Sequence, residues 1–98
     1  MTNATTYNVG DAAGWDLGVS GWENGKHFKV GDVLVFKYPK NLHSVVTVNK
    51  ANYDSCTPTG KTLTSGNDKV TLVKGTNYFI CGVPTHCQFD QKIAVTAN

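Results

Sequence analysis

Hydrophobic and polar residues alternate with a period of two along most of this 98-residue chain. In the segment 33–38, Leu34, Phe36 and Tyr38 would share one face of an extended strand, and the segment 45–49 mixes β-branched with polar residues. Such alternation is typical of strands with one face in a core. The pattern predicts short strands over residues 6–9, 26–30, 33–38, 45–49, 69–73, 77–81 and 92–96.

Turn residues separate these strands at short intervals, as in the pairs Gly31-Asp32 and Lys74-Gly75. No helical period is sustained over three turns, and only residues 50–55 could hold a short helical segment. A chain of 98 residues can remove roughly 60 to 65% of its unfolded surface from water, enough for one core. We therefore expect an all-β Greek-key sandwich, with residues 1–98 as a single domain.

The composition is that of an ordinary globular protein, with 40% hydrophobic and 16% charged residues. No apolar run is long enough to cross a bilayer, so we expect no membrane-spanning segment. The nine basic residues are all lysines, and they exceed the seven acidic residues by a net charge of +2. Without arginine there is no bidentate fork for phosphate or guanine, which argues against nucleic-acid binding.

The three cysteines Cys56, Cys81 and Cys87 cannot all pair within one chain, so we expect one disulfide and one thiol with another role. A disulfide indicates an oxidising compartment, and the sequon at Asn3 makes that residue a glycosylation candidate. No apolar h-region follows Met1, so we expect a mature extracellular domain without a signal peptide, with Met1 as a start residue added for expression.

Candidate metal ligands gather near the end of the chain, where His86 follows Cys81 by five residues. The turn between them, residues 82–85, contains glycine and proline and can direct two side chains to one point at a reduced cost in ordering entropy. If His43, at the start of its own strand, faces this loop, the set becomes one thiolate and two imidazoles. A His₂Cys set with a weak axial ligand is the blue-copper arrangement.

Spacing alone leaves other roles open for these residues. Cys81 could be a buried free thiol and His43 a core histidine, or Cys81 and His86 could be the nucleophile and base of a cysteine protease. Two cysteines and two histidines could also hold a structural zinc ion, but only if no disulfide forms. His27 has no partner at ligand spacing, and we expect it on the solvent side of a strand.

The order and spacing of these residues resemble the phytocyanins, the plant branch of the small blue copper proteins. The central pattern is His43, then Cys81-x₄-His86-x₄-Gln91, with Cys87 directly after the second histidine. Further short matches in family order extend the resemblance over nearly the whole chain, at residues 7–10, 14–15, 28–32, 34–36, 53–56 and 78–81.

The resemblance implies an eight-stranded cupredoxin-like sandwich with one short helical segment and a disulfide between Cys56 and Cys87. It implies one type 1 copper bound by His43, Cys81, His86 and Gln91. The implied function is that of a monomeric extracellular carrier of single electrons, not an enzyme, with an unidentified small-molecule or protein partner. The alternative is a non-redox cell-surface module in signalling or adhesion, and the four filled ligand positions count against it.

The axial position distinguishes two groups of this family. Five residues after the second histidine, the plantacyanin group has methionine and the stellacyanin group has glutamine. This chain resembles the plantacyanin group in length and glycine content, but it has glutamine at this position, Gln91. An amide oxygen is a harder donor than a thioether, so the resemblance implies a lower potential than methionine would give. Met1 is the only methionine and lies far from the loop, and we expect Gln88 on the surface. Asp90 stands where the family often has glycine.

Electron exit is expected at His86, because it lies on a turn beside glycine and proline. An apolar rim for docking could form around this turn from Gly14, Trp15 and residues 82–84. Trp15 and Trp22 are equally compatible with positions in the core or at its edge.

Overall fold

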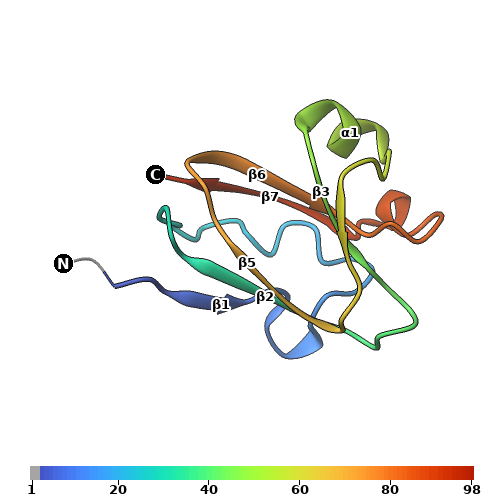
Figure 1. The fold of residues 1–98 in the computed structure, drawn as a ribbon, viewed down its shortest axis with the longest axis horizontal. Helices are drawn as coiled ribbons and strands as arrows, with labels where there is room; N and C mark the ends of the chain where they lie inside the picture. The colour runs from blue at the N-terminus through green and yellow to red at the C-terminus, as the bar shows by residue number, and fades with distance from the viewer. Residues whose placement is uncertain (1–2) are drawn as a thin grey trace.

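Two β-sheets pack face to face in the computed structural model, which describes residues 3–98 (Figure 1). Met1 lies outside the described residues. One sheet has the strand order β1-β2-β5 and the other β4-β3-β6-β7. The strands are β1 (Thr6–Asn8), β2 (Val33–Lys37), β3 (Val45–Val48), β4 (Lys61–Leu63), β5 (Asn67–Thr71), β6 (Gly75–Ile80) and β7 (Lys92–Ala97). The prediction of an all-β sandwich is confirmed.

Strand pairing is antiparallel throughout these sheets except between β1 and β2. Leu34 and Phe36 of β2 are fully buried and Lys37 is exposed, as the period of two predicts, but Val35 between them is buried as well. Phe36 meets Phe79 of β6 between the sheets, with ring centroids 5.2 Å apart. Trp15 packs edge-on against Phe36 at 5.0 Å. These aromatic contacts fix how the two sheets sit on each other.

The segment 26–30 does not form the predicted strand, because Phe28 makes only an isolated bridge with Ala97. The Lys29 amide donates to the Asp32 carboxylate at 2.9 Å, and the Asp32 amide donates back to the Lys29 carbonyl at 3.0 Å. These backbone groups therefore close a turn and do not pair with a neighbouring strand. Phe28 is buried although its strand pairing is limited to this one bridge, and His27 is exposed, but not on a strand.

The strand β4 was not predicted, because it is short and only Leu63 in it is partly buried. It lies at the edge of its sheet and owes its extended form to antiparallel pairing with β3. With residues 26–30 lost and β4 gained, residues 3–98 contain seven strands where the resemblance implied eight.

One α-helix, α1 (Lys50–Ser55), follows β3 over the residues predicted for it. It begins after Asn49, whose side-chain oxygen accepts from the Asn52 amide at 2.8 Å. It ends at Cys56, whose backbone is left-handed with φ 55°. Two 3₁₀-helices, η1 (Asp11–Ala13) and η2 (Cys87–Phe89), are the other short helical segments within residues 3–98.

The start of β1 and the end of β7 lie at one end of the sandwich, and the loops after β2 and β6 lie at the other (Figure 1). These two loops carry the candidate metal ligands. Within residues 3–98, no helix combines the length and apolar character that a membrane crossing requires.

Candidate metal centre

Three candidate ligands from two loops meet at one end of the sandwich. One ligand atom each from His43, Cys81 and His86 lies within 4.8 Å of the other two. The two histidine Nδ1 atoms are 3.1 Å apart, and Cys81 Sγ is 3.6 Å from His86 Nδ1. Metal–sulfur and metal–nitrogen bonds of about 2.3 and 2.0 Å, as for zinc, would let one ion contact all three atoms.

Cys81 directly follows β6 and is held there by backbone hydrogen bonds. Its amide donates to the Gln91 carbonyl at 3.0 Å, and the amide of Gly82 donates to Ser44 Oγ at 3.0 Å. A Cβ at Gly82 would lie only 2.9 Å from the same Oγ, so this close approach requires glycine. Cys81 is 2% exposed, and it is the free cysteine of residues 3–98. A substrate could not reach so buried a sulfur, which argues against the protease hypothesis.

His43 lies in the loop between β2 and β3, with its side chain 9% exposed. The next residue is anchored, because the buried Trp15 indole N–H donates to the Ser44 carbonyl at 2.8 Å. Burial and the neighbouring His86 lower the pKa of His43, while the Asp16 carboxylate and the Gln91 side chain act in the opposite direction. His43 is therefore neutral at neutral pH, which is the form that binds metals.

The loop from Cys81 to Gln91 folds back on His86. The His86 amide donates to the Val83 carbonyl at 3.2 Å, and the His86 carbonyl accepts from the amides of Phe89 and Gln91 at 3.0 and 3.1 Å. The helix η2 then ends at Asp90, which has φ 66°. Glycine adopts this left-handed region most readily, which explains in physical terms why glycine is frequent at the position of Asp90 in the family that the sequence resembles. The half-buried His86 is more accessible than Cys81.

Gln91 is a buried polar side chain without a hydrogen-bond partner. It is 0% exposed, and neither Oε1 nor Nε2 has a partner among residues 3–98. Its amide nevertheless neighbours His43, where it partly opposes the lowering of the His43 pKa by burial and by His86. A buried amide without a partner costs roughly 1–3 kcal/mol, so such groups call for a ligand or a functional explanation. The three grouped residues His43, Cys81 and His86 supply one sulfur and two imidazole nitrogens, a donor set that suits copper.

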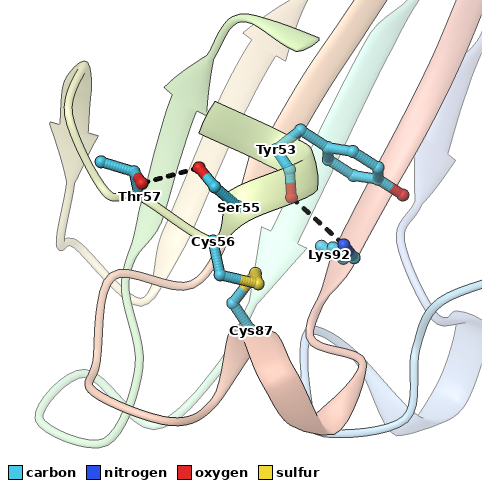
Figure 2. The surroundings of a disulfide bond; sticks show 6 residues. All are labelled: Tyr53, Ser55, Cys56, Thr57, Cys87 and Lys92. Carbon is cyan, nitrogen blue, oxygen red and sulfur yellow. Dashed lines mark hydrogen bonds between the residues drawn. A yellow bond between two sulfur atoms is a disulfide. The ribbon is translucent and has the colours of Figure 1, made fainter. Parts of the chain in front are cut away.

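The predicted disulfide between Cys56 and Cys87 is confirmed, with Cα atoms 5.7 Å apart (Figure 2). It joins the end of α1 to the start of η2 and so holds the residue next to His86. Figure 2 also shows a second link, in which Lys92 Nζ donates to the Tyr53 carbonyl of α1 at 3.1 Å. With two cysteines oxidised, the zinc hypothesis loses a ligand that it needs.

Other sequence candidates have simpler roles in the structure. Gln88 is exposed, as predicted, and so is Asn3 of the sequon. Trp15 is 1% exposed and belongs to the core, so its suggested role in a docking rim is wrong. Trp22 is half-buried, and its indole N–H donates to Asp11 at 3.1 Å.

Sequence reasoning missed one residue near the site, Asp16. Its Oδ1 lies 3.5 Å from Nε2 of His43. Asp16 has no distinctive spacing from any candidate ligand, so no signal in a single sequence could have identified it.

Known proteins resemble this chain over nearly its whole length. Residues 14–91 match the family of plastocyanin-like domains. The chain is 55% identical to the basic blue protein of Arabidopsis thaliana over 96 residues, which cover 96% of this chain and 74% of that protein. It is 54% identical to the chemocyanin of Lilium longiflorum over 99 residues, which cover 99% of this chain and 79% of that protein. The solved structure of cucumber basic protein, a blue copper protein, superimposes with a TM-score of 0.93 at 46% identity, covering 96% of this chain and all of that one.

Proposed function

The chain belongs to the phytocyanin family of plastocyanin-like domains, and we propose on this basis that it binds one copper ion and carries single electrons between redox partners. The observation that carries this proposal is the meeting of His43, Cys81 and His86 beside the buried, unpartnered amide of Gln91. Of the functions considered, only metal binding uses all four of these groups.

The proposed ligands are the Cys81 thiolate, the Nδ1 atoms of His43 and His86, and the side-chain oxygen of Gln91. A soft sulfur with two imidazoles and a weak oxygen donor suits both oxidation states of copper. When bound, copper supplies the one-electron Cu(II)/Cu(I) couple. This assignment also gives Gln91 Oε1 the partner that residues 3–98 do not provide.

The protein itself fixes these donor atoms in position and shields them from water. Cys81 and Gln91 are buried, so water has little access to them. The bond between the Cys81 amide and the Gln91 carbonyl joins the two ends of the ligand loop, and the bond from Gly82 to Ser44 joins this loop to the one that carries His43. Donors held by such bonds reorganise little when one electron moves, which favours fast transfer. The half-buried His86 is the side chain through which electrons would enter and leave.

We propose a monomeric carrier of one domain. We also propose that it is not an enzyme, because the buried Cys81 sulfur cannot meet a substrate directly. An extracellular location is supported by the disulfide, which persists in oxidising compartments, and the exposed sequon at Asn3 is compatible with glycosylation there. The partner would be a small molecule or a protein with a compatible potential. A non-redox module is not favoured, since such a role gives no reason for the buried donor set.

Adding Cu(II) to the folded metal-free protein tests this function. We expect an intense blue charge-transfer band at one copper per chain, bleached by a one-electron reductant and restored by an oxidant. Cys81→Ser should abolish the band, whereas Gln88→Ala, on the surface of the same loop, should keep it. A folded protein that gives no band would refute the proposal, and a band that cannot be bleached reversibly would favour the non-redox module.

A further inference from the structure

Asp16 is a charged residue beside the site that the proposed function leaves without a role. Its Oδ1 lies 3.5 Å from Nε2 of His43, the ring nitrogen opposite to the one that faces His86. The His43 side chain is 9% exposed and that of Asp16 is 59% exposed, so the carboxylate stands at the solvent edge of a buried imidazole.

Asp16 is held in place by its neighbours and is not a freely moving surface side chain. The Leu17 amide donates to Asp16 Oδ1 at 2.7 Å, which orients the carboxylate. The preceding residue, Trp15, is buried, and its indole donates to the carbonyl of Ser44. Two consecutive residues of one loop therefore contact two consecutive residues of the other, Trp15 with Ser44 and Asp16 with His43.

The loop after Asp16 also contacts the segment that follows His86. The Gly18 amide donates to the Phe89 carbonyl at 3.0 Å, and the Ser20 amide donates to the Asp90 carbonyl at 3.0 Å. Residues 15–20 thus connect both of the loops that carry the candidate histidines. The position of Asp16 relative to His43 is fixed by contacts on both sides.

Neutral His43 has two forms, which carry the proton on either ring nitrogen, and the Asp16 carboxylate lies nearer to one of these nitrogens, Nε2. A negative charge 3.5 Å from Nε2 favours the proton on that atom and leaves the lone pair on Nδ1. The 3.1 Å contact between the two Nδ1 atoms needs one donor and one acceptor. With the His43 proton on Nε2, His86 must be the donor in the metal-free protein.

We propose that Asp16 is a positioning residue that fixes His43 in its Nε2–H form and so keeps Nδ1 of His43 free to bind copper. The copper part rests on the proposed function, whereas the choice of proton position does not. Carboxylates that hold metal-binding histidines in this way typically change metal affinity by roughly 10–100-fold. Because Asp16 is partly exposed and its contact is long, we expect the lower limit, about tenfold.

The test compares the parent protein with Asp16→Ala, Asp16→Asn and a control that removes the same charge elsewhere, Asp54→Asn. Asp54 lies on α1 and pairs with Lys50 at 2.7 Å. Long-range ¹H–¹⁵N NMR of the metal-free proteins, at alkaline pH where imidazoles are neutral, reports which nitrogen of His43 is protonated. The Nε2–H form should dominate in the parent and in Asp54→Asn, and a mixture with the Nδ1–H form should appear in Asp16→Ala.

Competition titration with Cu(II) gives the second measurement, with about tenfold weaker binding expected for Asp16→Ala and a smaller loss for Asp16→Asn. A His43 that keeps the Nε2–H form in Asp16→Ala would overturn the proposal. A changed proton position with unchanged Cu(II) affinity would overturn its link to copper. If the parent does not bind Cu(II) while the proton position still responds to Asp16, the proposed function fails and the role of Asp16 stands. If Asp16→Ala does not fold, Asp16→Asn replaces it as the deciding variant, because its side-chain oxygen can still accept from the Leu17 amide. A partial shift of His43 toward the Nδ1–H form is then expected, and a His43 that shows no such shift would contradict the proposal.

Discussion

Replacing Gln91 with methionine should stabilise the metal-free protein. The Gln91 side chain is 0% exposed, and neither of its polar atoms has a partner among residues 3–98. A buried group in this state costs roughly 1–3 kcal/mol, and methionine fills a similar volume without a strong polar atom. Because the two side chains match in length, no cavity should open. We therefore expect the free energy of unfolding to rise by roughly 1–3 kcal/mol.

Urea unfolding of the metal-free variants measures this change. The midpoint should rise with an unchanged slope, and each kcal/mol corresponds to about 4–8 °C in Tm for a domain of this size. Gln88→Met is the matched control, because Gln88 is exposed on the same loop and should stay within about 0.5 kcal/mol of the parent. A Gln91→Met protein that is less stable than the parent, with a neutral control, would refute the reasoning. It would also remove the main structural support for Gln91 as a ligand.

The same substitution should raise the reduction potential of the copper-loaded protein. A thioether is a softer donor than an amide oxygen and stabilises Cu(I) relatively more. Voltammetry of the parent, Gln91→Met and Gln88→Met checks this, and only Gln91→Met should differ. An unchanged potential would contradict Gln91 as a ligand even if the stability result came out as expected.

Three further predictions concern the fold around the site. Replacing Cys56 and Cys87 together by serine should lower the free energy of unfolding of the metal-free protein by about 3.7 kcal/mol, because the disulfide closes a loop of 31 residues. Urea unfolding measures this loss, and a loss under roughly 1 kcal/mol would contradict the prediction. Asp90→Gly should relieve the strained left-handed backbone at φ 66°, which raises the free energy of unfolding by up to about 1 kcal/mol and raises the Tm with it. A lower Tm would show instead that the aspartate side chain stabilises this turn. Burial and the bond to Asp68 raise the pKa of Tyr38 from 10.0 to about 12. The unfolded chain loses this proton first, so stability should be fully present below pH 10 and fall as the pH rises toward 12, by at most about 2.7 kcal/mol. Urea midpoints measured against pH should show this fall in the parent and a smaller one in Tyr38→Phe.

The fold was predictable wherever a strand has two different faces. In residues 33–38, Leu34, Phe36 and Tyr38 are buried and Lys37 is exposed, and in residues 45–49 the polar Thr47 and Asn49 are exposed, so the polar positions follow the sheet period even though Val35 and Val46 are also buried. The pattern failed at residues 26–30, because Phe28 makes only a single bridge with Ala97 and the residues after it close a turn. It also failed at β4, which is extended because β3 pairs with it and not because of its own side chains.

The site was predictable to the extent that its residues are close in sequence. Cys81 and His86 lie on one short loop, so their spacing alone suggested that both could bind one metal ion. His43 comes from another strand connection, so the residues alone linked it to the other two only on the condition that it faces their loop, and the resemblance to a family supplied that condition. Asp16 reaches His43 because Trp15 docks on Ser44, and such a contact between two distant loops has no local signal.

Departures from ordinary burial and backbone preferences gather in the ligand loop. They are two left-handed residues, a buried free thiol and a buried amide without a partner, at Thr85, Asp90, Cys81 and Gln91. The left-handed residues and the unpartnered amide cost of the order of 1–3 kcal/mol each and persist only where the surroundings hold them. Here the disulfide at Cys87 and the bond from Trp15 to Ser44 hold both ligand loops, and neither contact involves a proposed ligand side chain. Copper would give the Gln91 amide the partner that residues 3–98 do not provide, so before the metal binds the disulfide and the Trp15–Ser44 bond must hold the two loops. The donors are then already in place, and binding or losing an electron requires little further movement.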